Sequence, residues 1–192
     1  MASDRFGTCS FDRIANDYGL LYGDAATALV LGKSRGALRI AGLVTQTEPA
    51  AEAMHRDLHE RSEPIANPYD IRETKRRFLE EHGQETLARM TQRALLRIKQ
   101  LLLPGNAERE LDHIVFPNMG RDLLEANYYP VFHDAARKSL WDFARTVGHL
   151  GTADAVAGLY ELCVARELLP GRKILVLGAG AGFTFSGMLI TT

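Results

Sequence analysis

Residues 148–154 carry the stretch Gly148-His149-Leu150-Gly151-Thr152-Ala153-Asp154, which we interpret as the start of a helix. Thr152 is a suitable N-cap, and apolar residues recur at helical spacing as far as Leu168, so the pattern predicts a helix over 152–168. The buried face that this spacing predicts consists of Val156, Leu159, Tyr160, Cys163 and Val164.

The same stretch brings together a histidine and a carboxylate. His149 would lie at the positive end of the helix dipole, and Asp154, one turn into the helix, could fold back to hold the imidazole in one tautomer. A base oriented by an acid supplies two of the three members of a nucleophilic triad. The spacing fits a structural helix cap equally well, so other stretches of the chain have to decide between the two interpretations.

The composition is that of an ordinary domain. The chain has 192 residues, of which 46% are hydrophobic and 24% charged, with a formal net charge of −1. There is no long uncharged apolar run, and the first residues lack the apolar segment of a secretory signal, so we expect a cytoplasmic protein that does not enter the membrane. The near-zero net charge argues against nucleic acid as a partner.

The two cysteines, Cys9 and Cys163, are too few for a disulfide scaffold. Cys163 lies on the predicted apolar face of its helix, where we expect a buried structural thiol. Cys9 lies in a polar segment with no helix start to activate it. We therefore expect neither cysteine to act as a nucleophile.

The first 45 residues predict a pair of strands after an irregular start. Residues 1–18 lack periodicity and are expected to form a loop. The small apolar run at 25–31 predicts a strand buried on both faces, and residues 37–45 predict a second strand. Because residues 32–36 have the length and chemistry of a turn, we expect the two strands to pair antiparallel.

The polar segment 49–69 is expected to run over the surface. His55 and His59 are four residues apart, which is a metal-ligand spacing. No matching Cys or third His accompanies them, so we expect no metal site.

Two helices are predicted next, from Asp70 to Gly83 and from Glu85 to about Leu103, where the second has a clear apolar stripe. The first carries the basic cluster Arg72, Lys75, Arg76 and Arg77. Such a cluster is usually a solvated helix face, and its functional interpretation is a docking patch for an acidic carrier.

A strand, a tight turn and a helix follow, which is where open α/β sheets place their chemistry. The strand is predicted over 112–116, the turn is Pro117-Asn118-Met119-Gly120, and the helix begins near Arg121. The remaining predicted elements are a helix over 139–146 and strands over 174–177 and 183–190.

The glycine run at 178–182 begins like a dinucleotide-binding fingerprint. The sixth position of that fingerprint, which should be glycine, is Phe183 in this chain, and the next segment alternates like a strand. We therefore reject a nicotinamide site. Glycines in a bend between strands let the backbone approach a ligand and point amides at it. We therefore consider Gly180, Ala181 and Gly182 as candidates for an oxyanion hole and for substrate binding.

Four stretches carry a family pattern when they are taken in chain order. They are Tyr22-Gly23-Asp24-Ala25-Ala26-Thr27-Ala28-Leu29-Val30-Leu31, Phe116-Pro117-Asn118, the stretch at 148–154, and Gly180-Ala181-Gly182-Phe183-Thr184-Phe185. Together they resemble the β-ketoacyl-ACP synthase III family of the thiolase fold. The similarity is closest to divergent actinobacterial members beside polyketide pathways, which include starter-unit synthases and acyltransferases.

The resemblance implies an α/β fold with five layers, α/β/α/β/α, built from two similar thiolase-like halves, and a homodimer with the active site between the halves. It assigns residues 1–48 to the end of the N-terminal half and residues 49–192 to the C-terminal half. The family nucleophile, a Cys or in some relatives a Ser, belongs to a helix start upstream of the Gly23-Asp24 stretch. The chain therefore needs a missing half or a partner chain to supply it.

Two departures from the family pattern suggest roles for three residues. Asn118 stands where the family usually has a histidine, and His149 stands where it usually has an asparagine. Since an amide cannot take a proton, His149 would be the base, Asp154 would orient it, and Asn118 would steady the oxyanion together with the amides around Ala181. The exchange favours acyl transfer to an amine, an alcohol or a carrier thiol over decarboxylative condensation.

The function we expect is acyl transfer from an acyl-CoA or acyl-carrier-protein thioester in fatty-acid, polyketide or antibiotic starter-unit biosynthesis, either as a condensation like that of β-ketoacyl-ACP synthase III or as transfer to another acceptor. No cofactor is needed besides this substrate, and the chain alone should be inactive. The alternatives are a non-catalytic partner subunit of such a synthase and an inactive truncated fragment.

Overall fold

The computed structural model of the chain is built around a four-stranded sheet in the order β3-β6-β5-β4. β3 (Arg39–Thr47), β6 (Thr184–Thr191) and β5 (Lys173–Gly180) pair antiparallel, whereas β4 (His113–Val115) runs parallel to β5. The structure describes residues 1–7, 12–15, 17–33, 36–55, 71–105, 107–164 and 168–192.

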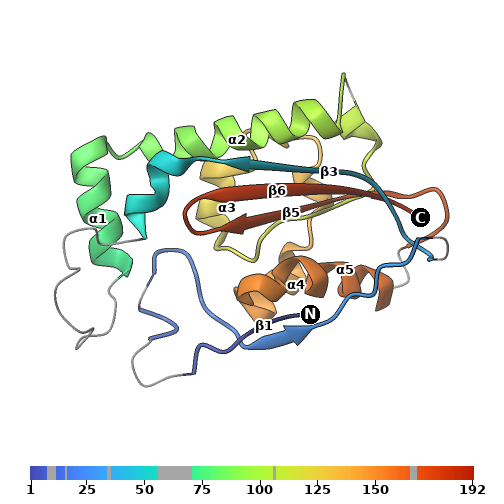
Figure 1. Cartoon of the computed structure of the whole chain (residues 1–192), viewed down its shortest axis with the longest axis horizontal. Helices are drawn as coiled ribbons and strands as arrows, with labels where there is room; N and C mark the ends of the chain where they lie inside the picture. Colours follow the sequence, from blue (N-terminus) through green and yellow to red (C-terminus); the bar gives the residue numbers. More distant parts are fainter. Residues whose placement is uncertain (8–11, 16, 34–35, 56–70, 106, 165–167) are drawn as a thin grey trace.

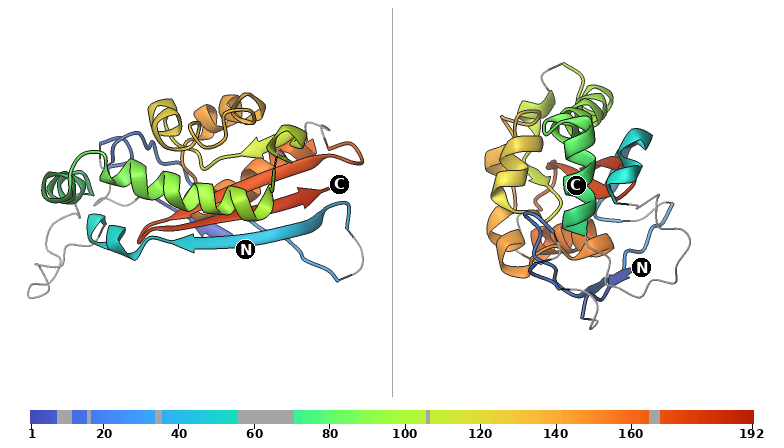
Figure 2. Two further views of the ribbon diagram at one scale, coloured as in Figure 1. Left: turned by 90° about the horizontal axis from the view of Figure 1, so that it is seen from above. Right: turned by 90° about the vertical axis from the view of Figure 1, so that its left-hand side faces the viewer.

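Helices cover both faces of this sheet (Figure 1 and Figure 2). α2 (Thr86–Leu102) and α3 (Arg121–Asn127) pack on one face, and α5 (Asp154–Val164) packs on the other. Successive residues of β5 show the division, because Leu175 packs with α2 and α3 whereas Ile174 packs with α5. The sheet therefore separates two apolar cores in a three-layer arrangement.

Helix α2 approaches the sheet closely at Gly187. A Cβ atom at this position would lie 2.4 Å from Cγ2 of Ile98 and 3.0 Å from Cδ1 of Leu102. Any larger residue in the middle of β6 would push α2 away from the sheet.

Most elements predicted from residue 70 onward are confirmed. α1 (Ile71–His82) and α2 are the two predicted helices, with the interruption at Gly83, and α4 (Trp141–Val147) is the helix predicted over 139–146. β4, β5 and β6 are the three predicted strands, and β5 continues three residues further than expected.

The helix predicted over 152–168 begins later and buries a different face. Residues 151–153 form a 3-10 turn and α5 begins at Asp154, so Thr152 is not its N-cap, and residues 165–167 lie outside the described residues. The buried residues of α5 are Asp154, Gly158, Leu159 and Leu162, whereas Tyr160, Cys163 and Val164 are exposed. Burial was predicted correctly for Leu159 and wrongly for Tyr160, Cys163 and Val164. The buried face is shifted because Gly158, without a side chain, is the position that packs against Val115 of β4.

The antiparallel pair predicted between 25–31 and 37–45 is also wrong. β2 (Ala25–Thr27) pairs with β1 (Ala2–Asp4), which lies in the segment expected to be a loop, and β3 pairs with β6. The rest of the apolar run is exposed, and Val30 is 93% exposed. Composition predicted burial there, but no described strand pairs with residues 28–31.

Strand β3 belongs to the same sheet as the C-terminal strands, since it pairs with β6 from Arg39 to Thr47. The boundary that we expected after residue 48, between two thiolase-like halves, stays a prediction.

The segment 49–69 does not begin as a surface excursion. The 3-10 helix Pro49–Met54 buries Ala51 and Met54 completely. Residues 56–70 lie outside the described residues.

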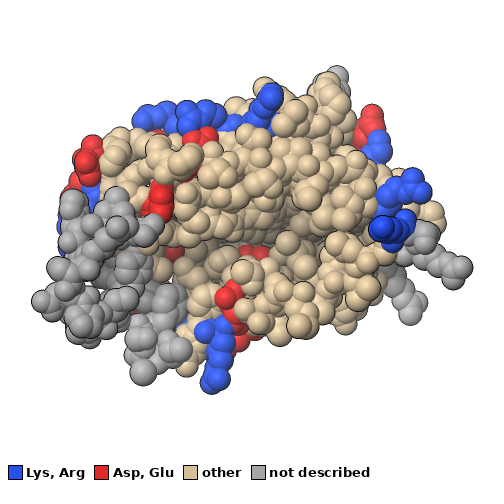
Figure 3. Space-filling view, viewed as in Figure 1, with Lys and Arg blue, Asp and Glu red and all other residues tan. Residues whose placement is uncertain are grey.

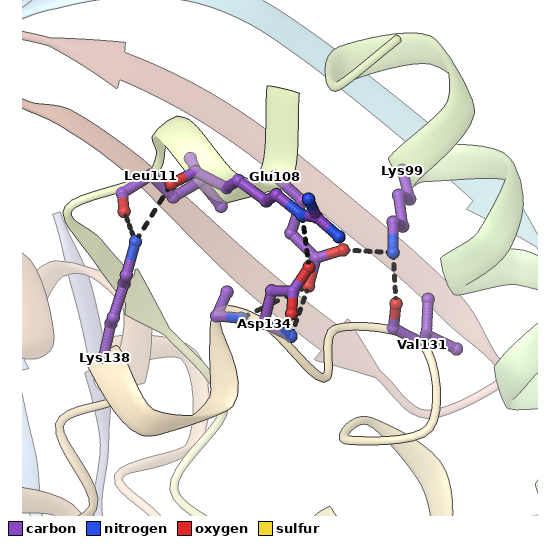
Figure 4. A network of polar contacts seen from close by, with 8 residues as sticks. Lys99, Glu108, Leu111, Val131, Asp134 and Lys138 are labelled. Atoms are coloured by element: carbon purple, nitrogen blue, oxygen red, sulfur yellow. Dashed lines mark hydrogen bonds and ion pairs between the residues drawn. The ribbon is translucent and has the colours of Figure 1, made fainter. Parts of the chain in front are cut away.

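A polar network ties the end of α2 to the segments before β4 and after α3 (Figure 4). Lys99 forms an ion pair with the buried Glu108 and donates a hydrogen bond of 2.6 Å to the carbonyl oxygen of Val131. Glu108 also accepts hydrogen bonds from the backbone amides of Asp134 and Ala135, at 3.1 and 3.3 Å. Because the buried carboxylate has both a charge partner and amide donors, the network fixes these segments against α2.

One face of the molecule carries few charges (Figure 3). Lys, Arg, Asp and Glu lie mostly around its rim, and the area over β3, β6 and α5 is formed by other residues. Exposed large apolar side chains of the described residues include Leu29, Val30, Leu31, Leu43 and Tyr160. Within the described ranges, no helix combines the length and the apolar character that crossing a membrane requires.

Candidate active site

His149 and Asp154 are in direct contact. The Nδ1 atom of His149 donates a hydrogen bond of 2.6 Å to Oδ2 of Asp154, which leaves Nε2 as the nitrogen that can accept a proton. The two side chains are 17% and 8% exposed. A carboxylate that fixes one tautomer of an imidazole and stabilises its protonated form makes that imidazole suitable as a general base.

Asp154 also binds two backbone amides from outside the helix that it begins. Its Oδ1 atom accepts a hydrogen bond of 2.7 Å from the amide of Leu150, and Oδ2 accepts a second one, of 3.0 Å, from the amide of Asn118. Its place at the start of α5 is one where the helix dipole favours a negative charge. A structural role and the catalytic interpretation are therefore compatible, because one carboxylate receives all three donors and none of them belongs to α5.

Gly148 sets the backbone direction at His149. Its φ angle is 74°, and a Cβ atom there would lie 2.4 Å from the carbonyl oxygen of Leu21. The amide of His149 donates to this carbonyl at 2.7 Å, and the carbonyl of His149 accepts from the amide of Gly23 at 2.9 Å. On the other side, Nδ2 of Asn118 donates to the carbonyl of Gly148 at 2.9 Å. The segment 21–23 on one side and Asn118 on the other thus fix the backbone at His149.

Tyr22 is a site residue whose role the sequence analysis missed. Its ring lies edge-on to the imidazole of His149, with ring centroids 5.4 Å apart. Its hydroxyl donates a hydrogen bond of 3.0 Å to Asp17, whose carboxylate forms a 2.5 Å ion pair with Lys75. Burial, followed by the charge of Asp17, raises the pKa of the Tyr22 hydroxyl above its ordinary value, so the hydroxyl remains a donor. The signal in the sequence was its position directly before Gly23.

A cavity of about 660 Å³ adjoins His149. Its walls come from α1, α2, α3, the segment 18–22 and the turn between β5 and β6, and most of the lining side chains are apolar or aromatic. Small-molecule sites typically have volumes of roughly 300–1,000 Å³. The candidate base therefore lies at the wall of a space that can hold an apolar substrate group.

The glycine turn reaches the same cavity. Gly180 and Ala181 line it together with His149, whereas Gly182, which has a φ angle of 108°, is not among the lining residues. Asn118 does not line the cavity either, because its side-chain amide is directed at the carbonyl of Gly148. The structure brings His149, Asp154 and the Gly180–Ala181 backbone together, and their chemical roles stay predictions.

His55 lies on the wall of this cavity, edge-on to Phe183 with ring centroids 5.1 Å apart. Burial, followed by the positive charge of Lys75, lowers the pKa of His55 to about 4, so its ring is neutral near pH 7. Its expected companion His59 lies outside the described residues. Among the residues that the structure describes, no cluster of three His, Cys, Asp or Glu side chains could hold a metal ion.

The basic cluster of α1 is largely neutralised. Lys75 pairs with Asp17, Arg76 pairs with Glu73 and Glu80, and Arg77 pairs with Glu73. The guanidinium of Arg72 lies over the ring of Tyr18, 4.7 Å from its centroid. This helix face therefore offers less uncompensated charge to an acidic carrier than its sequence suggests.

Cys163 is exposed on α5 and is not among the residues lining the cavity, which corrects the prediction of a buried thiol. Its position gives it no access to His149 within the described fold. Cys9 lies outside the described residues.

A protein-family model matches the C-terminal part of the chain. Residues 104–192 match the family described as 3-oxoacyl-[acyl-carrier-protein (ACP)] synthase III C terminal. The matched part contains β4, β5 and β6 and the His149–Asp154 pair. A comparison with curated proteins found no match.

Solved structures extend the similarity to nearly the whole chain. ChlB3, described as an acyltransferase, is 31% identical with a TM-score of 0.87, and the match covers 99% of this chain and 57% of ChlB3. The 3-oxoacyl-(acyl carrier protein) synthase III FabH from Xanthomonas oryzae pv. oryzae is 22% identical with a TM-score of 0.59, over 81% of this chain and 40% of FabH. OleA from Xanthomonas campestris is 21% identical with a TM-score of 0.55, over 81% of this chain and 38% of OleA.

These comparisons establish a thiolase-like α/β fold, which confirms the fold class predicted from the sequence. Residues 104–192 are similar to the C-terminal part of 3-oxoacyl-ACP synthase III. The chain spans 57% of the length of ChlB3 and about two fifths of the length of FabH and OleA.

Proposed function

We propose that this chain supplies the general base of an acyltransferase that uses an acyl-CoA or acyl-carrier-protein thioester in fatty-acid or polyketide starter-unit biosynthesis. The observation that supports this most directly is the 2.6 Å hydrogen bond between His149 and Asp154 at the wall of the 660 Å³ cavity. An imidazole held at Nδ1 can take a proton from a nucleophile at Nε2. The similarity to ChlB3, an acyltransferase, supports the class of reaction.

The nucleophile belongs to a half of the protein that this chain does not contain. The chain spans 57% of ChlB3, and among the described residues no cysteine lines the cavity beside His149. A Cys or Ser from an N-terminal thiolase-like half, on the same polypeptide or on a partner chain, would complete the triad. The completed enzyme would be a homodimer, and the chain alone would be inactive.

The proposed reaction has two stages, and in each of them His149 takes up a proton and gives it back. As the nucleophile attacks the thioester carbonyl, its proton passes to Nε2, and the amides near Ala181 stabilise the negative carbonyl oxygen. Collapse of this intermediate breaks the carbon–sulfur bond, and the departing thiolate takes the proton from His149, which leaves an acyl-enzyme. The acceptor, an amine, an alcohol or a carrier thiol, then gives its proton to His149 and attacks the acyl-enzyme carbonyl. As the bond between the acyl group and the nucleophile breaks, the nucleophile takes the proton back from His149, which restores the free enzyme.

Asn118 has a positioning role in this proposal. Its side-chain amide donates to the carbonyl of Gly148, and its backbone amide donates to the carboxylate of Asp154. Asn118 therefore fixes the two residues that position His149. An asparagine cannot accept a proton, so position 118 supplies no second base beside His149. This favours acyl transfer over a decarboxylative condensation that uses a histidine at position 118.

The test is to produce the chain together with the nucleophile-bearing half, encoded upstream of Met1 or by a separate gene, and to add acyl-CoA. We expect intact mass spectrometry to show one acyl adduct on the added half, and no adduct on the 192-residue chain by itself. His149→Ala should abolish the adduct, whereas the exposed His133→Ala should leave it unchanged. A stable complex without any adduct would favour the non-catalytic partner subunit instead.

A further inference from the structure

The turn between His149 and Asp154 is held from outside by a side chain of strand β1. Residues 151–153 form this turn, which joins the candidate base to the carboxylate that orients it. The Oδ2 atom of Asp4 accepts hydrogen bonds from the backbone amide of Thr152, at 2.6 Å, and from its hydroxyl, at 2.8 Å. The two residues are 148 positions apart, so the contact depends on the fold of the chain.

Strand pairing brings Asp4 to this turn. β1 pairs antiparallel with β2, where Asp4 lies opposite Ala25, and β1 lies next to the start of α5 (Figure 1). β2 begins two residues after Gly23, whose amide donates to the carbonyl of His149. One short segment therefore contacts His149 directly and also places Asp4 beside the turn.

Gly151 leaves the space that the Asp4 carboxylate occupies. A Cβ atom at this position would overlap Oδ2 of Asp4, and the backbone has a φ angle of 60°, in the region that favours glycine. The turn therefore accommodates the carboxylate through its conformation and through its lack of a side chain.

The position of the turn determines the geometry of the base. Asp154 follows the turn directly, and its carboxylate binds the amide of Leu150 and Nδ1 of His149, which precede the turn. A shift of the turn would change the length and the direction of the 2.6 Å hydrogen bond to the imidazole. A displacement of about 1 Å in an active site can cost roughly a hundredfold in rate.

We propose that Asp4 is a positioning residue for acyl transfer, and that it acts on His149 through the turn 151–153. Asp4 is not among the residues that line the cavity, so it acts on the base and not on the bound acyl group. It also lies outside residues 104–192, the part that the family model matches. The inference rests on the proposed function, because it concerns the rate at which His149 takes a proton from the nucleophile.

The test measures, in the completed enzyme, the maximal rate of acyl-enzyme formation and the acyl-CoA concentration that gives half of this rate. Asp4→Ala removes the acceptor of both hydrogen bonds. Because residues 21–23 and Asn118 still hold the backbone at His149, we expect the maximal rate to fall about tenfold and the half-saturating concentration to stay within about twofold.

Two further variants of β1 accompany this one. Asp4→Asn keeps an oxygen that can accept from both donors of Thr152, so its rate should stay within about threefold of the wild type. Ser3→Ala, at the exposed neighbouring position, is the control and should change neither value.

A second background distinguishes action through His149 from a general loss of structure. In the Asp154→Asn enzyme, whose imidazole has already lost its fixed partner, Asp4→Ala should slow the reaction by no more than about twofold. A further tenfold loss there would overturn the inference. If a thermal melt shows that Asp4→Ala is unfolded, Thr152→Val takes its place. Thr152→Val removes one donor and should cost about threefold, and Thr152→Ser should restore the rate.

The outcomes separate this inference from the proposed function. A folded Asp4→Ala enzyme with the maximal rate of the wild type would overturn the positioning role and leave the proposed function standing. A tenfold higher half-saturating concentration at an unchanged maximal rate would do the same. A wild-type completed enzyme that forms no acyl-enzyme would overturn both.

Discussion

The ring of Tyr22 lies edge-on to the imidazole of His149, with centroids 5.4 Å apart and ring planes at 67°. The hydroxyl of Tyr22 is fixed by Asp17, which is in turn paired with Lys75 of α1. Asp154 holds the other side of the imidazole through Nδ1. The orientation of the candidate base therefore depends on the first 25 residues as well as on the domain at 104–192.

The first prediction concerns the base itself. In the completed enzyme, His149→Ala should slow acyl-enzyme formation by about a hundred- to ten-thousand-fold, since it removes the proton acceptor. Single-turnover mass spectrometry measures this rate, and a thermal melt checks that the variant is folded. A rate near that of the wild type would reduce His149 to a structural residue.

The second prediction concerns the carboxylate that receives three donors. Asp154→Asn would direct an NH₂ group at one of the donors on His149, Leu150 or Asn118, and should cost about 1–3 kcal/mol of unfolding free energy. It should also slow acyl transfer, because the imidazole loses the partner that fixes its tautomer. Urea unfolding and the acyl-transfer rate measure the two effects. Asp142→Asn, at a side chain that is 98% exposed, is the control and should change neither.

Local patterns allowed much of the second half of the fold to be predicted. The apolar stripe that contains Leu95 and Ile98 predicted α2, and the strand-turn-helix pattern around Asn118 predicted β4 and α3. The His149–Asp154 contact could also be anticipated, because its two residues are five positions apart around one helix start. In each case the interacting residues are close in sequence.

Long-range pairing explains what the sequence did not reveal. β1 was missed because Ala2–Asp4 has no periodicity and becomes a strand through its partner Ala25–Thr27. Tyr22 and the Asp17–Lys75 pair were missed because their contacts join distant segments. The buried face of α5 depends on how tightly the helix approaches β4 at Gly158, which its apolar spacing does not encode.

The third prediction separates two members of the basic cluster. The side chains of Lys75 and Asp17 are 13% and 0% exposed, so Lys75→Met leaves a buried carboxylate without its cation and should cost about 3 kcal/mol of unfolding free energy. Arg77→Met breaks an exposed pair and should cost less than about 1 kcal/mol. Urea unfolding compares the two variants, and Asp17→Asn combined with Lys75→Met should recover part of the loss. Equal costs for the two single variants would show that the Asp17–Lys75 pair is solvated.

The fourth prediction is a pH dependence from His55. Its pKa is lowered to about 4 in the folded protein, from 6.5 as the ordinary value, so between these values the unfolded state binds more protons. The stability associated with His55 is complete above pH 6.5 and is lost as the pH falls toward 4, by roughly 3 kcal/mol at most. Urea unfolding at pH 7 and pH 5 should show a smaller loss for His55→Gln than for the wild type. The exposed His133→Gln should behave like the wild type, and a His55→Gln variant with an unchanged loss would contradict the assignment.

The last prediction concerns the apolar surface that the described residues leave uncovered. Leu29, Val30 and Leu31 are exposed beside β2, and Leu43 is exposed on β3. Exposed large apolar side chains favour association, so we expect the chain alone to form oligomers whose size grows with concentration.

Sedimentation velocity over a range of concentrations measures this association. Val30→Lys combined with Leu43→Lys should shift the distribution toward monomer, because the added charges cannot be buried without a partner. Gln100→Lys adds a charge at an exposed position of α2 and should leave the association unchanged. Adding the nucleophile-bearing half should replace the oligomers with a defined complex. A wild-type chain that stays monomeric at every concentration would show that this surface is stable in water without a second half to cover it.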